Sequence, residues 1–227
     1  MKEGDFAEID YIGRIVSSNE IFDLTDEAMA KKEGIYNEKR KYGPVLVILG
    51  AHMVIPGVEK NVMEMKIGEE REFDVEPDQA FGMRNPKLVL IVSKAKFLKE
   101  NINPMPGMFV DIDGRQAKIQ SVSGGRVRVD LNNPLSGRQL HYKIKLLRQL
   151  KEPFDKVDGL IKYLRLKCDI ELKAGVLTAT REKWDDLLKR MIEEPVKKWI
   201  KEIKKVEFVT KGQNKKAEKS KKTISEK

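Results

Sequence analysis

Apolar and polar residues alternate near the start of the chain and predict a strand there. Over residues 7–15 most apolar side chains share one parity, whereas charged side chains take most positions of the other. Alternation of this kind marks a strand with one buried face. The same period returns over residues 71–75 and 140–146, and residues 45–49 are apolar throughout. Together these segments predict the strands of one sheet.

One short helix is predicted between these strands. Val58, Val62 and Met65 recur at helical spacing, and Gly68 ends the pattern. We expect residues 50–57 before this helix to form a loop. Residues 24–43 are polar and charged with scattered apolar positions, so they predict a long surface flap.

Residues 85–133 have the pattern of a separate module. Residues 87–97 predict a strand followed by a connection, and the short alternating segments after them include a hairpin signal at Asp113-Gly114. The strand predicted at 140–146 then needs a partner in the sheet of the first eighty residues. We therefore expect a small all-β module inserted into the first domain.

Residues 153–210 predict a third region, in which helices and strands are mixed. An amphipathic helix over 154–164 is followed by strand-like residues up to 180. We expect Thr180 to cap a second helix, Pro195 to break it, and a third helix and a strand to follow. A unit of this size buries too little apolar surface to be more than marginally stable alone, so docking or dimerisation would help to stabilise it.

Composition narrows the class of protein. The 227 residues include a single cysteine, Cys168, which excludes an internal disulfide framework and fits a reducing compartment. No apolar run approaches the roughly 18 residues that cross a membrane, and the N-terminal residues lack the apolar core of a signal peptide. The expected location is cytoplasmic.

Much of the positive charge lies at the C-terminal end. Residues 211–227 contain seven Lys and two Glu, so they carry +5 of the net charge of +9. A segment with so few apolar residues is expected to be disordered. Such a tail either keeps the protein in solution or contacts nucleic acid or the ribosome, because basic arms bind phosphate backbones.

Several segments of the first 150 residues, taken in their order along the chain, carry a family resemblance. They are YIGRI, FD, VLVILG, VIPGVE, IGEEREFDVEPDQAFG and LSGRQLHYKIKLL. This order resembles the FKBP-type peptidyl-prolyl cis-trans isomerases. The insertion after AFG resembles the insert-in-flap domain of the SlyD branch, and the extra C-terminal region is similar to that of the long archaeal members.

The resemblance implies a fold and its domain boundaries. The fold class is α+β, with an antiparallel half-barrel sheet wrapped on a short helix, a small all-β insert-in-flap domain and a small C-terminal α+β domain. The isomerase domain is expected to be discontinuous. The expected boundaries are residues 1–84 plus 134–152 for the isomerase domain, 85–133 for the insert, 153–210 for the C-terminal domain and 211–227 for a disordered Lys-rich tail.

The resemblance also implies the residues of a proline-binding pocket. The expected catalytic residues are Tyr11, Asp23, Ile55, Phe81 and Tyr142. The residues expected to hold the substrate there are Phe22, Val45, Val47, Val54, Val58 and Leu140. A chaperone surface on the insert is expected to use Val89, Ile91, Phe97, Met105, Met108 and Phe109.

Two positions depart from the family pattern. Val58 stands where Trp is frequent, and Phe81 stands where Tyr is usual, so the hydroxyl that binds ligand in relatives is absent. We expect weaker binding of drug-type ligands. His52 and His141 are isolated from other metal-binding residues in the sequence, and the tail is rich in Lys rather than in His and Cys. No cofactor and no metal site are therefore expected.

The segment from Met53 to Gly82 suits this chemistry because it offers apolar residues where most enzymes offer acids, bases or nucleophiles. Rotation about an X-Pro bond meets a barrier near 20 kcal/mol from amide resonance. The twisted amide is less polar than the planar one, so a dry apolar pocket favours the transition state. Asp23 is expected to orient the chain or to contact the twisted carbonyl.

The expected function is a folding helper that isomerises X-Pro bonds and holds unfolded or proline-containing polypeptide clients on its insert. One alternative is a holdase whose isomerase pocket is weak or idle. Another is a nucleic-acid or ribosome binder that uses the basic tail. The C-terminal domain is expected either to form a homodimer or to widen the cradle that holds clients, and no membrane contact is expected.

Overall fold

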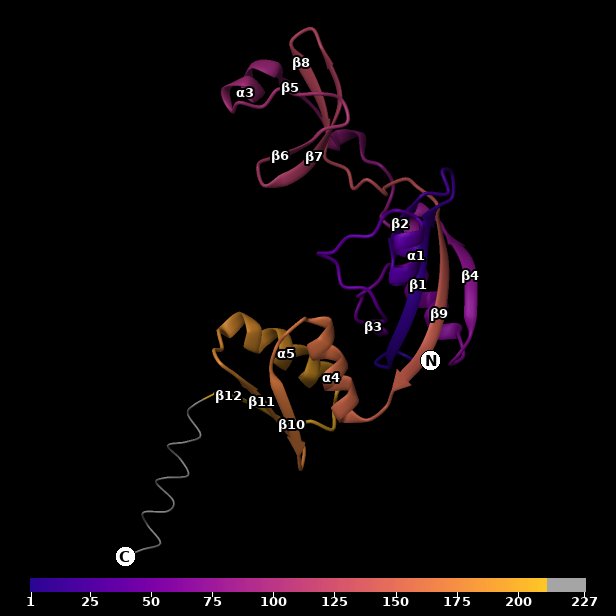
Figure 1. Ribbon diagram of the computed structural model, residues 1–227, viewed down its shortest axis with the longest axis vertical. Coiled ribbons are helices and arrows are strands. Elements are labelled where there is room, and N and C mark those ends of the chain that lie inside the picture. Colours follow the sequence, from indigo (N-terminus) through magenta and orange to yellow (C-terminus); the bar gives the residue numbers. More distant parts are fainter. Residues whose placement is uncertain (212–227) are drawn as a thin grey trace, which may run out of the picture.

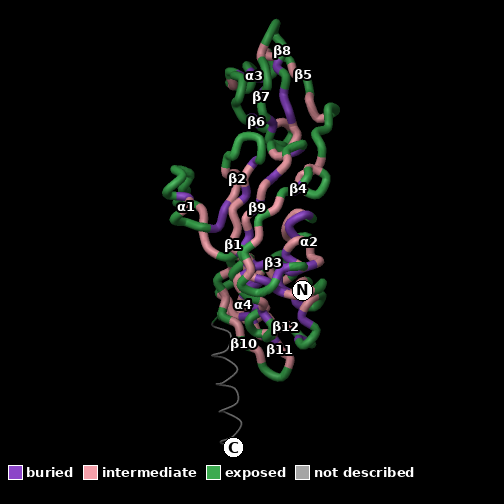
Figure 2. Tube along the Cα trace, turned by 90° about the vertical axis from the view of Figure 1, so that its right-hand side faces the viewer, coloured by how far each residue is buried: buried purple, intermediate pink, exposed green. Residues whose placement is uncertain are grey.

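A computed structural model describes residues 1–211 of the chain. Within these residues the strands form three sheets (Figure 1). The insert and the C-terminal unit lie at opposite ends of the first sheet in both Figure 1 and Figure 2. Apart from Lys211, the predicted Lys-rich tail lies outside the described residues.

The first sheet is antiparallel and takes its strands from both sides of the insert. Its order is β2-β1-β9-β4, and β3 also pairs with β1. The position of Tyr142 in β9 is opposite Gly13 of β1 on one side and Phe73 of β4 on the other. The strand bounds are β1 (Phe6–Ile15), β2 (Ile21–Leu24), β3 (Val45–Ile48), β4 (Glu70–Val75) and β9 (Leu140–Leu150).

The predicted short helix, α2 (Pro56–Glu64), packs on the inner face of this sheet. Pro56 is the first helical residue. Its lack of an N–H costs nothing there, because N–H groups of the first turn have no partner within the helix. Val58 and Val62 of α2 are buried against apolar side chains of the strands. The predicted half-barrel wrapped on a helix is therefore confirmed.

The predicted flap contains a helix that its sequence pattern did not reveal. This helix, α1 (Glu27–Lys32), is capped by Asp26, whose Oδ1 accepts the Met29 N–H at 3.0 Å. Only Ala30 of α1 is buried, and Figure 2 shows the helix standing out from the sheet. An exposed helix of six residues leaves too few apolar positions for a periodic signal.

The insert has its own sheet and its own core. The sheet order is β5-β8-β7-β6, and its elements are η2 (Pro86–Leu88), β5 (Val89–Ser93), α3 (Lys94–Lys99), β6 (Phe109–Ile112), β7 (Arg115–Ser123) and β8 (Arg126–Asp130). Asp113 and Gly114 both have positive φ, so the predicted hairpin is confirmed. The helix α3, however, replaces the predicted connection. Ser93 caps it, and Phe97 anchors it in the core of the insert.

The two linkers of the insert are bonded to each other. Asn85 N–H donates to Asn132 Oδ1 at 2.8 Å, and Asn132 Nδ2 donates to the Asn85 carbonyl at 3.1 Å. Buried Asp130 accepts from Arg84, from Gln120 Nε2 at 2.9 Å and from Asn132 Nδ2 at 2.8 Å. This network fixes where the insert leaves the first sheet.

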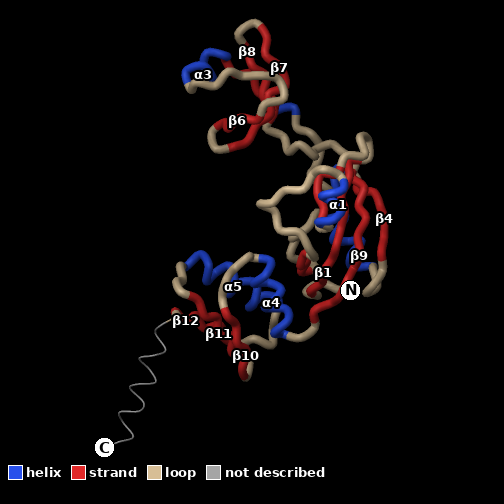
Figure 3. The backbone as a smooth tube through the Cα atoms, in the orientation of Figure 1, coloured by secondary structure: helices blue, strands red, loops and turns tan. Residues whose placement is uncertain are grey.

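The C-terminal unit packs two helices on a three-stranded sheet (Figure 3). In this sheet β11 lies between β10 and β12, and β11 and β12 are parallel. The bounds are α4 (Pro153–Tyr163), β10 (Asp169–Lys173), β11 (Val176–Arg181), α5 (Asp186–Trp199) and β12 (Lys205–Thr210).

Two predictions for this unit were wrong. Thr180 lies inside β11, and Asp185 caps the following helix by accepting the Leu188 N–H at 2.8 Å. Pro195 lies inside α5 and does not end it. Ile192 and Val196 are buried on either side of this proline. Their packing offsets the roughly 3 kcal/mol that an interior proline costs.

The C-terminal unit shares a core with the first sheet. Phe6, Leu46 and Leu150 of the sheet belong to the same buried cluster as Leu160 and Ile192 of α4 and α5. A Cβ added to Gly159 would lie 2.9 Å from Leu150 Cδ1, so this glycine allows α4 to approach closely. No helix in residues 1–211 is long and apolar enough to cross a membrane.

Candidate active site

A cavity of about 380 Å³ opens between the inner face of the first sheet and the start of α2. Two strands, β1 and β9, form one wall, and the loop before α2 forms another. Most of its lining is apolar. The lining residues are Ile9, Tyr11, Asp23, His52, Met53, Val54, Ile55, Val58, Phe81 and Tyr142.

All five residues predicted to be catalytic line this cavity, although they come from distant parts of the chain. Tyr11 lies in β1, Asp23 in β2 and Tyr142 in β9. Ile55 immediately precedes α2, and Phe81 follows η1 (Pro77–Gln79). Val54 and Val58, which were predicted to hold the substrate, also line the cavity.

Four other residues predicted to hold the substrate lie outside this lining. Val47 and Leu140 are fully buried in the core beneath it. Phe22 packs edge-on against Tyr142, with 5.7 Å between the ring centroids. Val45, at the first position of β3, lines a different cavity that α4 partly covers. Val45 begins β3 and so lies at the opposite end of that strand from the loop that forms the cavity rim.

Aromatic rings hold Tyr142 in place at the back of the cavity. The centroids of Tyr11 and Phe73 lie 6.1 and 6.3 Å from that of Tyr142. Phe22 completes the group and depends on Gly13, because a Cβ at Gly13 would lie 2.5 Å from Phe22 Cζ. A glycine in β1 thus makes room for a ring that supports the cavity wall.

The Asp23 carboxylate is bonded through both of its oxygens. Tyr11 Oη donates to Oδ2 at 2.6 Å, and Arg40 Nη2 donates to Oδ1 and also to the Leu24 carbonyl. Stacked Tyr36 and Tyr42 rings, 5.5 Å apart, brace the loop that carries Arg40. Because each of its oxygens accepts a hydrogen bond, Asp23 is held in place to orient groups at the cavity edge.

Sequence reasoning did not identify Arg40. Its guanidinium lies among charged residues of the predicted flap, where a single cation carries no distinctive signal. Arg40 is nevertheless the only arginine between Arg14 and Arg71. A guanidinium presents a planar fork of donors that suits a carboxylate. A lone arginine at position 40 was therefore the sequence signal that could have pointed to a partner for Asp23.

The two tyrosine hydroxyls of the cavity stay protonated. Burial raises the pKa of Tyr11, and its hydrogen bond to Asp23 raises that pKa further. Burial and the nearby Asp23 charge raise the pKa of Tyr142 as well. Both side chains are therefore un-ionised O–H groups throughout the neutral range.

Buried Glu59 of α2 holds the loop that forms the rim. Its Oε1 accepts the Gly50 N–H at 2.8 Å, and its Oε2 lies 3.4 Å from His52 Nδ1. His52 and Met53 are lining residues that sequence reasoning did not select. The left-handed φ of 54° at His52 belongs to a loop geometry that the residue pattern does not encode. Within residues 1–211, no hydrogen bond uses the Ile55 N–H beside them.

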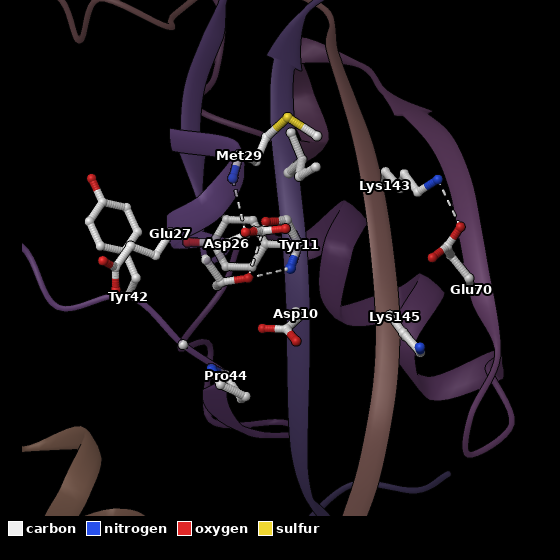
Figure 4. Close-up of a pocket in the computed structure, with 13 residues that line it drawn as sticks. Asp10, Tyr11, Asp26, Glu27, Met29, Tyr42, Pro44, Glu70, Lys143 and Lys145 are labelled. Atoms are coloured by element: carbon white, nitrogen blue, oxygen red, sulfur yellow. Dashed lines mark hydrogen bonds and ion pairs between the residues drawn. The ribbon is translucent and has the colours of Figure 1, made fainter. Parts of the chain in front are cut away.

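A larger cavity, of about 540 Å³, lies across the sheet (Figure 4). Strand alternation places Lys143 and Lys145 on this face and Tyr142 on the other. Figure 4 shows charged side chains around it, including Lys143 Nζ, which is 2.8 Å from Glu70 Oε1. Its mixed charges do not suit the burial of an apolar ring. Among residues 1–211, no group of three or more His, Cys, Asp and Glu could hold a metal ion.

Comparison with known proteins identifies the family of this chain. Residues 1–99 match the FKBP-type peptidyl-prolyl cis-trans isomerase family. A short-type peptidyl-prolyl cis-trans isomerase of Methanocaldococcus jannaschii is 32% identical over 146 residues, which are 64% of this chain and 92% of that relative. This chain belongs to the FKBP-type peptidyl-prolyl cis-trans isomerases. The predicted family resemblance and enzyme class are thereby confirmed.

Other FKBP-type relatives extend the match. The FKBP-type 16 kDa peptidyl-prolyl cis-trans isomerase of Escherichia coli K12 is 32% identical over 109 residues, 46% of this chain and 72% of the relative. The SlyD isomerase of Helicobacter pylori is 35% identical over 109 residues, 46% of this chain and 58% of the relative. Residues 91–135 match the FKBP26 IF domain, so the predicted insert-in-flap character is also confirmed.

Proposed function

We propose that this isomerase acts by seating a client proline in the 380 Å³ cavity and letting the X-Pro bond twist there without acid, base or nucleophile. The observation that carries the proposal is the character of the lining. Most of it is apolar, its one carboxylate already accepts two donors, and its tyrosines stay protonated.

The apolar lining favours the twisted state for an electrostatic reason. Resonance in the planar amide separates charge between O and N, and water stabilises that separation. Twisting removes the resonance, so a group moved from water into an apolar cavity loses less solvation when it is twisted. Catalysis then follows from binding the transition state better than the ground state. The unused Ile55 N–H is suited to anchor a carbonyl of the client.

A volume-conserving polar substitution tests this mechanism. Val54→Thr adds a hydroxyl to the cavity with little change of shape, and it can hydrogen-bond the planar carbonyl. A neutral hydrogen bond to the planar bound state is worth about 1 kcal/mol, so we expect kcat on a proline tetrapeptide to fall about fivefold while KM falls as well. A protease-coupled assay measures this rate. Val45→Thr, outside the cavity, serves as the matched control, and equal rates for both variants would contradict the mechanism.

We propose that the insert holds unfolded clients through exposed apolar side chains. Ile91 is 69% exposed and Phe109 is 48% exposed. Phe97, predicted for this surface, is instead in the core of the insert, and Val89 is half-buried. Flexible methionines suit a surface that accepts many sequences. The proposed client surface consists of Leu90, Ile91, Leu98, Met105, Met108 and Phe109.

We propose that the C-terminal unit mediates a homodimer. Leu187 and Met191 of α5 are exposed, whereas Ile192 and Val196 of the same helix are buried. Sedimentation at micromolar concentration is expected to give twice the chain mass, and a Leu187→Lys variant is expected to give the monomer mass. A monomeric wild-type protein would contradict this proposal. Contact of the basic tail with nucleic acid concerns residues mostly outside the described part of the chain.

A further inference from the structure

The Tyr142 hydroxyl differs from the other polar side chains of the cavity. Tyr11 and Asp23 bond each other, and His52 lies against Glu59. Tyr142 Oη makes no hydrogen bond within residues 1–211. The residue is only 7% exposed, yet its oxygen is not among the fully buried unpaired atoms of that range. The hydroxyl therefore keeps access to the cavity that its ring lines.

The ring that carries this hydroxyl is held rigidly. Phe73 stacks on it at an interplanar angle of 19°, and Phe22 meets it edge-on at 81°. Tyr11 is tilted by 52° against it. A donor fixed by its surroundings loses little freedom when a ligand arrives, so its hydrogen bond contributes more to binding. A partly buried donor without a partner is also rare in proteins unless a ligand or water serves it.

We propose that the Tyr142 hydroxyl donates a hydrogen bond to a backbone carbonyl of the bound client that flanks the X-Pro amide. This inference rests on the function proposed above. Together with the Ile55 N–H, the Tyr142 hydroxyl would give the cavity two donors on different walls. One comes from β9 and the other from the loop before α2. Two such anchors fix an extended segment on either side of the proline ring.

The flanking carbonyl is a better acceptor than the carbonyl of the rotating bond. Twisting removes the resonance that places negative charge on the carbonyl oxygen of the rotating amide. A donor on that oxygen would stabilise the planar state and slow the reaction. A donor on a flanking carbonyl binds the planar and twisted states equally, so it raises affinity and leaves the turnover number unchanged.

The test compares Tyr142→Phe with wild type on a proline tetrapeptide. One neutral hydrogen bond predicts a KM increase of about three- to tenfold with kcat within about twofold. Thermal unfolding should be unchanged, because the variant removes no hydrogen bond seen within the described residues. Tyr163→Phe, at an exposed position of α4, is the matched control and should change neither parameter.

Two results would overturn the inference. An unchanged KM would mean that the hydroxyl does not contact the client. A change in kcat of more than about twofold would mean that it acts on the rotating bond itself: kcat would rise if the hydroxyl stabilises the planar carbonyl and would fall if it stabilises the twisted state. The Val54→Thr variant distinguishes a failure of the Tyr142 inference from a failure of the proposed function. If Val54→Thr slows the reaction and Tyr142→Phe does not, only the present inference falls. If neither substitution has an effect, the cavity is not the site.

Discussion

Replacing residues 85–131 with a short linker is expected to slow the catalysed refolding of a proline-limited protein about a hundredfold, while tetrapeptide isomerisation stays within about twofold. The reason is effective concentration: a client held on the insert presents its prolines repeatedly to the nearby cavity, and tethering of this kind raises apparent affinity by about 10²- to 10⁴-fold. A tetrapeptide is too short to reach both places. The measurement is refolding fluorescence beside the peptide assay.

The structure indicates that the excision leaves the cavity intact. Ser136 Oγ donates to the Phe81 carbonyl at 3.0 Å, and Gly137 N–H donates to the Gly82 carbonyl at 2.8 Å. The loop that carries Phe81 is thus held by residues outside the excised segment. A double variant, Ile91→Ser with Phe109→Ser, keeps the insert but removes part of its apolar surface. Refolding catalysis equal to wild type in both variants would exclude a client-holding insert.

Asp23→Ala is expected to lower kcat/KM on the tetrapeptide about tenfold. Loss of the carboxylate leaves the Tyr11 hydroxyl and the Arg40 guanidinium without their shared partner at the cavity edge. Hydrogen bonds to charged groups are worth about 1.5–3 kcal/mol, and about 1.4 kcal/mol changes a rate tenfold. We expect the loop that carries Arg40 to move as well, because its anchor to β2 is weakened.

The matched control for this variant is Asp10→Ala. Asp10 is the neighbour of Tyr11 in β1 and lines the charged cavity on the other face of the sheet. It should leave kcat/KM within about twofold. Arg40→Ala should lower kcat/KM less than Asp23→Ala, since the bond between Tyr11 and Asp23 remains. Full activity of Asp23→Ala would show that this carboxylate has no part in positioning the client.

The sequence predicted the parts of the fold where one face of an element is buried. Period-two alternation marked β1, β4 and β9, and the spacing of Val58 and Val62 marked α2, because each places apolar residues on a core. It missed α1 and α3, which are six residues long and bury one residue each. It also ended a helix at Pro195, since propensity alone does not reveal the tertiary packing that keeps α5 continuous.

The residues of the candidate site also divide into those that the sequence could place and those that depend on tertiary contacts. Tyr11, Asp23 and Phe81 could be placed from the family order of motifs, because the fold brings β1, β2 and the loop after η1 together. Val45 could not be placed in this way, because only the tertiary structure shows which end of β3 borders the cavity. Arg40 and His52 lie in loops whose geometry depends on stacked tyrosines and on buried Glu59. Such contacts are set by tertiary structure.

The strand order of the first sheet has a consequence for how the protein is made. Among the described strands β4 pairs with β9 alone, and β9 is separated from it by the whole insert. Ribosomes add about 5–20 residues per second, so β4 waits several seconds for its neighbour. The contacts of the insert are local and can form during that delay. A nascent chain can therefore expose the apolar side chains of its insert before β9 has completed the cavity.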